Sequence, residues 1–265
     1  MEKKLQISYI KETMTMKKKR FFSSILLIML IIIFLASGGY LFHYFWMAKQ
    51  TENELSQLQQ IRQEAFSDTE EETEVKSETG RSIQKGYRKL YKKNSDLIGW
   101  VTVKNTKIDY PILKDKDVYY LKHTFDKKYN SNGSIFTTNS YPFEDKETIV
   151  YGHNMKNGSM FSDLGKYLNK DFLNSHFNFK IYTPTCNYEA RIFSVYSIGV
   201  ETESNNIKSL NFEDRIEYYK KASEYNIETD SNIKKIVKLS TCSYLNATTI
   251  PTDQRYYIVA NLIQL

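Results

Sequence analysis

The alternation of apolar and polar residues divides the chain into a helical N-terminal part and a longer part made of strand-like runs. Eight runs have the period-two alternation, or the β-branched and aromatic content, that is typical of strands. They are residues 98–103, 107–113, 134–137, 148–152, 179–182, 188–198, 233–241 and 256–262. Their number and spacing predict an antiparallel barrel or sandwich.

Apolar residues recur at helical spacing in several stretches before and between these strands. The stretches are residues 82–93, 118–123, 160–168 and 212–225. In the last of them Phe212, Ile216 and Tyr219 fall on one side, and Asn211 is a suitable N-cap residue. We therefore expect a mainly β domain with short helices.

One long segment near the N-terminus lacks charge altogether. No charged side chain occurs over residues 21–48, and residues 25–36 are apolar throughout. About 20 apolar residues cross the hydrocarbon layer of a membrane, so we expect a membrane-spanning helix. A cleaved signal peptide is the alternative, because residues 36–38 are small, as at a cleavage site. The basic residues 17–20 place the N-terminus in the cytoplasm, and both interpretations place the rest of the chain outside the cell.

Composition divides the chain into four parts. Residues 1–20 form a basic cytoplasmic tail, and residues 21–47 form the membrane anchor. Residues 48–80 are expected to be a stalk, in which a short helix precedes an acidic, solvated linker. Residues 81–265 form the extracellular domain.

The basic residues are unevenly distributed. Lys and Arg exceed Asp and Glu by 6 over the chain, and residues 1–47 contain seven basic and two acidic side chains. The remainder is therefore almost neutral, which argues against nucleic acid as a partner. Cys and His show no metal-ligand spacing, so we expect neither a metal nor another cofactor.

Three strand ends carry residues suited to nucleophilic catalysis. The alternation in IVKLSTC places Cys242 on the outer face at the end of its strand, and Arg255 opens the next strand on the same surface. His153 follows the strand-like run at residues 148–152. A thiol, an imidazole and a guanidinium are candidates for nucleophile, acid/base and anion stabiliser.

Three motifs together resemble one known family. They are YGHNM at residues 151–155, LSTC at residues 239–242 before a strand that opens with Arg, and DLIGWVTVKNTKIDYPIL at residues 96–113. From Leu90 to the C-terminus the chain resembles the class B sortases, which are membrane-anchored cysteine transpeptidases of Gram-positive bacteria. The resemblance implies an eight-stranded closed β-barrel, with N-terminal helices and a helix inserted before the strand that carries the cysteine.

The resemblance also implies a mechanism. The Cys242 thiolate would attack the carbonyl of a Thr in a C-terminal sorting signal, giving a thioester that an amine of a peptidoglycan precursor then displaces. His153 would protonate the leaving amine and deprotonate the incoming one. Arg255 would bind the developing oxyanion or the peptide carbonyls of the substrate. Because Ser243 and Tyr244 follow the cysteine, we do not predict a Cys-His-Asp triad.

Residues close to the cysteine are candidates for binding the sorting signal. They are Ser240, Thr241, Tyr244 and Thr248, and the backbone at Thr241 is a further candidate oxyanion donor. The loop around Thr248 and the inserted helix would form the walls of the substrate groove. The family suggests a pentapeptide signal with Pro near its start and Thr before the cut.

Several alternatives remain open at this point. The amine could come from a Lys of another protein, as in pilin polymerisation. The same residues could perform hydrolysis alone as a surface cysteine protease, or the domain could be a binding module without catalysis. Cys186 and Cys242 could form a disulfide in an exported domain, although Cys186 is expected to be a turn thiol without a role.

Overall fold

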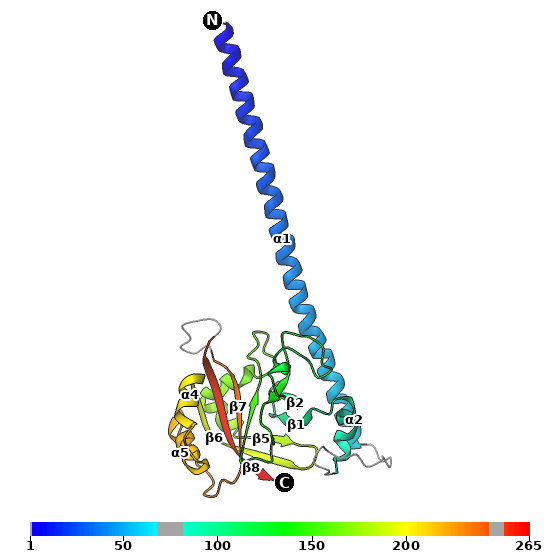
Figure 1. Cartoon of the computed structure of the whole chain (residues 1–265), viewed down its shortest axis with the longest axis vertical. Coiled ribbons are helices and arrows are strands. Elements are labelled where there is room, and N and C mark those ends of the chain that lie inside the picture. The colour runs from blue at the N-terminus through cyan, green and yellow to red at the C-terminus, as the bar shows by residue number, and fades with distance from the viewer. Residues whose placement is uncertain (1, 68–81, 244–251) are drawn as a thin grey trace. The chain divides into compact units, whose positions relative to one another are not determined.

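The computed structural model describes residues 2–67, 82–243 and 252–265 (Figure 1). The chain forms two compact units, residues 1–50 and residues 51–265. Helix α1 (Glu2–Ser67) begins in the first unit and ends in the second. The helix predicted for the stalk is thus continuous with the apolar segment.

The first unit consists of α1 alone among its described residues. Over Phe21–Glu64, α1 is long and apolar enough to cross a membrane, and its most apolar stretch buries nothing inside the protein. Large apolar side chains such as Phe34, Leu35 and Phe42 are exposed. Length and composition therefore fit a membrane span, and a signal sequence has the same features.

Among the described residues of the second unit, eight strands form a closed barrel in the order β1-β2-β3-β4-β7-β8-β6-β5. They are β1 (Leu97–Thr102), β2 (Asp109–Lys114), β3 (Ile135–Thr137), β4 (Glu147–Tyr151), β5 (Asn178–Tyr182), β6 (Asn187–Gly199), β7 (Ile236–Cys242) and β8 (Gln254–Gln264). All eight predicted strands are present, with bounds that differ by a few residues. The closed barrel implied by the family resemblance is confirmed.

The expectation of an antiparallel barrel was wrong for two pairs of neighbouring strands. The pairs β2–β3 and β4–β7 are parallel, and the other neighbouring pairs are antiparallel. Parallel neighbours require a long crossover connection, and residues 115–134 supply one between β2 and β3. Strands β5 and β6 lie between β8 and β1 in the closed barrel. The neighbour of β4 is therefore β7 and not β5.

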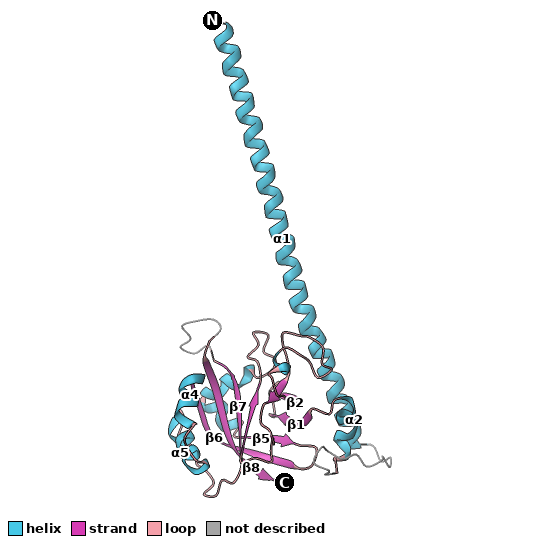
Figure 2. Ribbon diagram, in the orientation of Figure 1, coloured by secondary structure: helices cyan, strands magenta, loops and turns pink. Residues whose placement is uncertain are grey.

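Short helices flank the barrel (Figure 2). Four of them coincide with predicted helical stretches, namely α2 (Lys85–Lys93), η1 (Tyr119–Leu121), η2 (Ser162–Leu168) and α5 (Phe212–Ala222). The side chain of Asn211 caps α5 by accepting a hydrogen bond from the backbone N–H of Asp214 at 2.8 Å. Sequence patterns missed α3 (Lys170–Ser175) and α4 (Val200–Ile207), because α3 has only six residues and α4 has few apolar ones.

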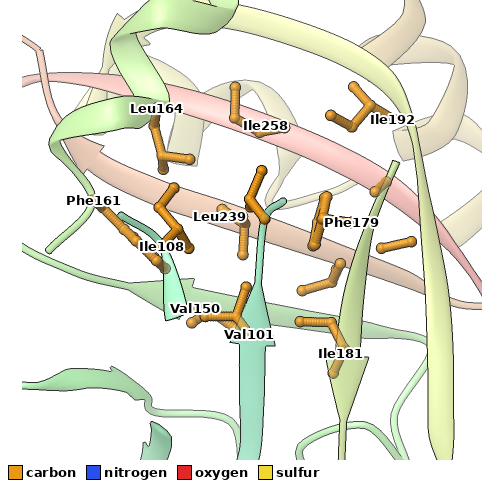
Figure 3. Close-up of a cluster of buried hydrophobic side chains, with 14 of the residues drawn as sticks. Val101, Ile108, Val150, Phe161, Leu164, Phe179, Ile181, Ile192, Leu239 and Ile258 are labelled. Atoms are coloured by element: carbon orange, nitrogen blue, oxygen red, sulfur yellow. The ribbon is translucent and has the colours of Figure 1, made fainter. Parts of the chain in front are cut away.

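The barrel interior is filled by one face of each strand. In Figure 3, Leu239 of β7, Ile258 of β8 and Val150 of β4 point toward a common interior, together with Phe161 and Leu164. These side chains are buried. The alternation predicted for β7 and β8 is therefore confirmed for the inward-facing set.

The outer face of β7 and β8 is covered as well. Helices α4 and α5 lie on this side of the barrel (Figure 1), and Ile236, Tyr257 and Val259 pack beneath α5. Lys238, which the alternation places outward, is buried among these groups, with its ammonium 2.8 Å from a carboxylate oxygen of Glu203 on α4. An outward-facing position on this strand is thus not a solvated one, because the inserted helices exclude water.

The C-terminal part of α1 belongs to the barrel unit. Leu58 is buried in a cluster that includes Tyr87 of α2 and Trp100 of β1. Arg62 forms an ion pair with Asp109 at 3.2 Å. Residues 51–67 therefore support the barrel, while residues 68–81 of the expected linker lie outside the described part of the chain.

Candidate active site

Cys242 and Arg255 are direct cross-strand partners. They form the last register pair of the antiparallel β7–β8 ladder, which Ser243 continues with a 2.8 Å hydrogen bond from its N–H to the carbonyl of Gln254. Directly opposite residues of an antiparallel pair have Cβ atoms about 5 Å apart and lie on the same face of the sheet. The predicted placement of thiol and guanidinium on one surface is therefore observed.

The Arg255 guanidinium is turned toward the beginning of its own strand. Its Nη1 donates to the carbonyls of Thr252 and Gln254, both at 2.9 Å. The side chain is half-buried. These bonds use two of the five N–H donors of the guanidinium, and a fork of donors is the feature that suits an oxyanion or a peptide carbonyl.

His153 reaches the same end of the barrel through the parallel β4–β7 pair. Tyr151 is in register with Ser240, and the N–H of Gly152 donates to the carbonyl of Ser240 at 3.1 Å. His153 lies two residues after Tyr151 and Cys242 lies two residues after Ser240, so both stand at the same level beyond the ladder. The two residues are 89 positions apart, and the sequence contains no local signal of this pairing.

The neighbour of His153 joins the two segments. Asn154 Nδ2 donates a hydrogen bond of 2.7 Å to the backbone carbonyl of Cys242. This bond holds the turn that carries the imidazole against the end of the strand that carries the thiol. Gly152 permits the close approach behind it, because a Cβ there would lie 2.4 Å from Ile135 Cδ1.

The imidazole is oriented by a backbone carbonyl. His153 Nε2 lies 2.8 Å from the carbonyl oxygen of Leu121 in η1. Since a carbonyl oxygen only accepts, Nε2 carries a hydrogen, and the neutral ring keeps Nδ1 as its proton acceptor. The group that orients the candidate base is thus a main-chain atom, which no motif search finds.

The carbonyl of Leu121 is itself held in place. The buried carboxylate of Asp115 accepts a hydrogen bond of 2.6 Å from the N–H of Tyr120, at the start of η1. Gly133 has a φ of 58°, and a Cβ at this position would lie 2.4 Å from the oxygen of Leu121. The turn at Gly133 therefore packs directly behind the acceptor of the imidazole.

Two tyrosines lie on either side of Ser240, which is two residues before Cys242 on β7. Ser240 is in register with Tyr151 on β4 and with Tyr257 on β8. Burial raises the pKa of both phenols above the ordinary value, and Arg255 offsets only part of this effect on the pKa of Tyr257. Both hydroxyls are neutral at physiological pH, so neither supplies a charge to the site.

The structure describes two of the four predicted substrate-binding residues. Ser240 and Thr241 are buried, and the Thr241 Oγ1 has no hydrogen-bond partner among the described residues. Because both side chains are buried, neither is open to a peptide in this structure. Tyr244 and Thr248 lie outside the described residues.

The alternative of a Cys186–Cys242 disulfide was wrong. Both cysteines are free thiols. Cys186 lies in the β5–β6 turn, two residues before Tyr188, which pairs with Gln264 at the C-terminal end of β8. Cys242 pairs with Arg255 near the beginning of β8. The two thiols thus stand near opposite ends of β8, and nine residues of strand span about 30 Å.

Comparison with known proteins agrees with this architecture. The sequence model of the Sortase domain family matches residues 101–263, which is more than half of the chain. The chain belongs to the sortase family. Sortases are cysteine transpeptidases, so the resemblance stated from the motifs is confirmed at the level of family and enzyme class.

Individual sortases show how far the similarity extends. Sortase B of Listeria monocytogenes is 45% identical over 166 residues, which is 58% of this chain and 66% of the relative, just under two thirds of its length. Sortase B of Staphylococcus aureus is 28% identical over 193 residues, 69% of this chain and 77% of the relative. A structure of the Staphylococcus aureus sortase B–substrate complex superposes with a TM-score of 0.68 and 26% identity, covering 82% of this chain and 98% of that chain.

Proposed function

We propose that this sortase cleaves a C-terminal sorting signal after Thr and transfers the protein to an amine of the peptidoglycan precursor. One observation carries the proposal: Cys242, His153 and Arg255 come to one end of the barrel on a sortase scaffold. The apolar segment of α1 fits a single-pass membrane anchor with the N-terminus in the cytoplasm and the enzyme outside the cell.

In the first half of the reaction, His153 Nδ1 takes the proton of the Cys242 thiol, and the resulting thiolate attacks the carbonyl carbon of the Thr. The C–N bond of the scissile peptide breaks, and His153 gives a proton to the leaving amine. The products are a thioester on Cys242 and the released C-terminal peptide. With Leu121 holding Nε2–H, Nδ1 is the nitrogen that exchanges this proton.

In the second half, the amine of the acceptor attacks the thioester carbonyl. His153 Nδ1 takes the proton of the amine, an amide forms, and the thiolate leaves. Arg255 binds the oxyanion of each tetrahedral intermediate when it exchanges the carbonyls of Thr252 and Gln254 for the substrate oxygen.

Mass spectrometry of the full chain in detergent tests the proposal. The full chain is used because Leu58 and Arg62 of α1 pack on the barrel. Sorting-signal peptides with Pro near the start and Thr before the cut are incubated with and without triglycine. We expect a thioester adduct on Cys242 and, with triglycine, a peptide–triglycine product.

Three results would contradict the proposal in different ways. Free acid as the sole product, even at high triglycine concentration, would indicate a protease that only hydrolyses. Faster transfer to a folded protein lysine than to triglycine would indicate pilin polymerisation. Binding of the peptide without any adduct, unchanged in Cys242→Ala, would indicate a binding module.

A further inference from the structure

A cleft of about 690 Å³ opens beside the turn that follows β4. Its walls are the β1–β2 turn, which contains Lys107, the β4 turn from Asn154 to Gly158, and the η2 segment, which contains Asp163 and Lys166. The volume is within the usual range for small-molecule and cofactor sites. We call it the basic cleft, and its lining residues used below are Lys107, Asn154, Lys156, Asp163 and Lys166.

The basic cleft shares a residue with the candidate active site. Asn154 lines the cleft, and its side chain donates to the carbonyl of Cys242 at 2.7 Å. The carbonyl of His153 accepts a hydrogen bond of 2.9 Å from the N–H of Phe161, and this bond also holds the turn in place. A group bound in the cleft therefore lies on the flank of the thiol and the imidazole.

The charge in the cleft is unbalanced. Asp163 is buried and both of its carboxylate oxygens are engaged, one by the ammonium of Lys166 at 2.8 Å and the other by the N–H of Lys107 at 3.1 Å. Across residues 82–243 and 252–265, the ammonium groups of Lys107 and Lys156 have no carboxylate partner. The cleft thus carries two uncompensated cations, which favour an anionic ligand.

The position of Lys107 directs its charge toward the β4 turn. Its Nζ lies 3.4 Å from the carbonyl of Asn157, and a Cβ at Gly158 would lie 3.2 Å from it. Gly158 has a φ of 78°, so the turn presents backbone and no side chain to this ammonium. Lys107 therefore crosses from the β1–β2 turn to the side of the cleft that adjoins Asn154.

The order of the strands separates the two flanks of Cys242. β7 lies between β4 and β8, so Arg255 stands on the β8 side of the thiol. The turn after β4, which forms one wall of the basic cleft, stands on the β4 side with His153. A sorting signal that contacts Arg255 occupies the first flank. The second flank remains for the amine that His153 deprotonates.

We propose that the basic cleft binds an anionic group, phosphate or carboxylate, of the amine acceptor and so selects acceptors that carry such a group near the reacting amine. This inference rests on the proposed transpeptidase function and adds the class of acceptor to it. Lys107 and Lys156 supply the charge, and Asn154 connects the bound acceptor to the thioester.

Matched acceptors test this inference on the full chain. Gly-Gly-Gly-Ser-amide is the neutral acceptor, and the same peptide with phosphoserine or with Asp in place of Ser provides phosphate or carboxylate. We expect kcat/KM for the anionic acceptors to exceed that for the neutral one at low salt. The ratio should fall as ionic strength rises, since salt screens exposed charges. The better of the two anionic peptides identifies the preferred group.

The double variant K107Q/K156Q isolates the cleft. Its kcat/KM for the preferred anionic acceptor should fall about tenfold, as expected for loss of charge-assisted contacts, while hydrolysis and transfer to the neutral acceptor stay within about twofold. The matched control K180Q/K221Q removes two exposed lysines elsewhere and should leave all three rates unchanged. The phosphoserine peptide should also protect Lys107 and Lys156 from acetylation, as read by mass spectrometry.

The outcomes separate the two proposals. Transfer to all three acceptors at equal rates, or an equal loss with neutral and anionic acceptors in K107Q/K156Q, would overturn the acceptor inference alone. Absence of transfer to any acceptor in the unmodified enzyme would overturn the transpeptidase proposal and this inference with it.

Discussion

The side-chain amide of Asn154 donates a 2.7 Å hydrogen bond to the backbone carbonyl of Cys242. This bond links the segment after β4 to the end of β7, just beyond the point where the ladder between them ends at Tyr151 and Ser240. It therefore controls the distance between the imidazole of His153 and the thiol at a place where no strand pairing does so.

Replacing Asn154 should separate catalysis from stability. Asn154→Ala removes the donor, and a misplacement of about 1 Å in reacting groups costs on the order of a hundredfold in rate. We expect kcat to fall by about 10- to 100-fold, while the free energy of unfolding falls by about 1 kcal/mol. Steady-state kinetics and urea unfolding measure the two effects. Asn205→Ala, an exposed position on α4, is the control, and an unchanged kcat in Asn154→Ala would remove the bond from the site.

The thiol and the imidazole should both be required. Cys242→Ala and His153→Ala should abolish formation of the thioester and of the amide product, because each removes a reacting group. Circular dichroism should show the barrel intact, since His153 lies beyond the end of β4 and Cys242 is the last residue of β7. Cys186→Ala is the matched control, and it should keep full activity because that thiol lies near the other end of β8. Wild-type turnover in either active-site variant would refute the assignment.

The guanidinium of Arg255 should not be replaceable by an ammonium. Arg255→Lys keeps the charge and loses the fork of donors, so we expect a loss of kcat/KM of about a hundredfold, as for other oxyanion donors. Arg191→Lys, at a half-exposed position on β6, should change nothing. Peptide cleavage assays at saturating acceptor measure both. Full activity in Arg255→Lys would exclude Arg255 from substrate binding and catalysis.

Gly133 should matter through the carbonyl that it packs against. An alanine Cβ would lie 2.4 Å from the oxygen of Leu121, which must move and release Nε2 of His153. We expect Gly133→Ala to lower kcat at least tenfold and to shift the pH profile of kcat/KM, because the imidazole loses its orienting acceptor.

Gly158→Ala is the control for backbone strain at Gly133. Gly158 also has positive φ, but its Cβ would meet only the flexible end of Lys107 at 3.2 Å. Both variants should lose about 1–2 kcal/mol of stability because a side chain is placed in the left-handed region, and Gly133→Ala should lose more because its Cβ also meets backbone atoms. If hydrolysis falls equally in the two variants, the effect at Gly133 is strain alone and the role of the Leu121 carbonyl is refuted.

The buried ion pair beneath α4 should stabilise the inserted helices. Glu203→Ala leaves the ammonium of Lys238 buried without its 2.8 Å partner, and we expect a loss of about 3–5 kcal/mol in the free energy of unfolding. The double variant K238M/E203L should recover most of the loss, because no unpaired charge remains. Glu217→Ala breaks an exposed pair with Lys220 and should have no measurable effect in the same denaturation experiment.

The fold could be predicted from the sequence where one strand face is apolar and the chain turns locally. All eight strands and the cap at Asn211 were accessible in this way. The two parallel pairs were not, because pairing between distant strands leaves no trace in local alternation. Lys238 illustrates the same limit, since its burial depends on helices that are far away in the sequence.

The candidate site was predictable only in part. Cys242 and Arg255 belong to adjacent strands, so alternation placed them on one surface, and the motif around His153 supplied the third group through the family resemblance. The Leu121 carbonyl was out of reach, because every residue has a carbonyl and only the three-dimensional arrangement selects one. An Asn-Gly turn at residues 132–133 was the single sequence feature that could have directed attention to this loop.

The parallel pairing of β4 with β7 has a consequence for how the enzyme matures. Tyr151 and Ser240 are 89 positions apart, and contacts between such distant residues form late and slowly during folding. A chain that is synthesised from its N-terminus contains the imidazole long before the thiol. The enzyme therefore becomes reactive only when the last strands close the barrel, which keeps incomplete chains from forming an acyl-enzyme.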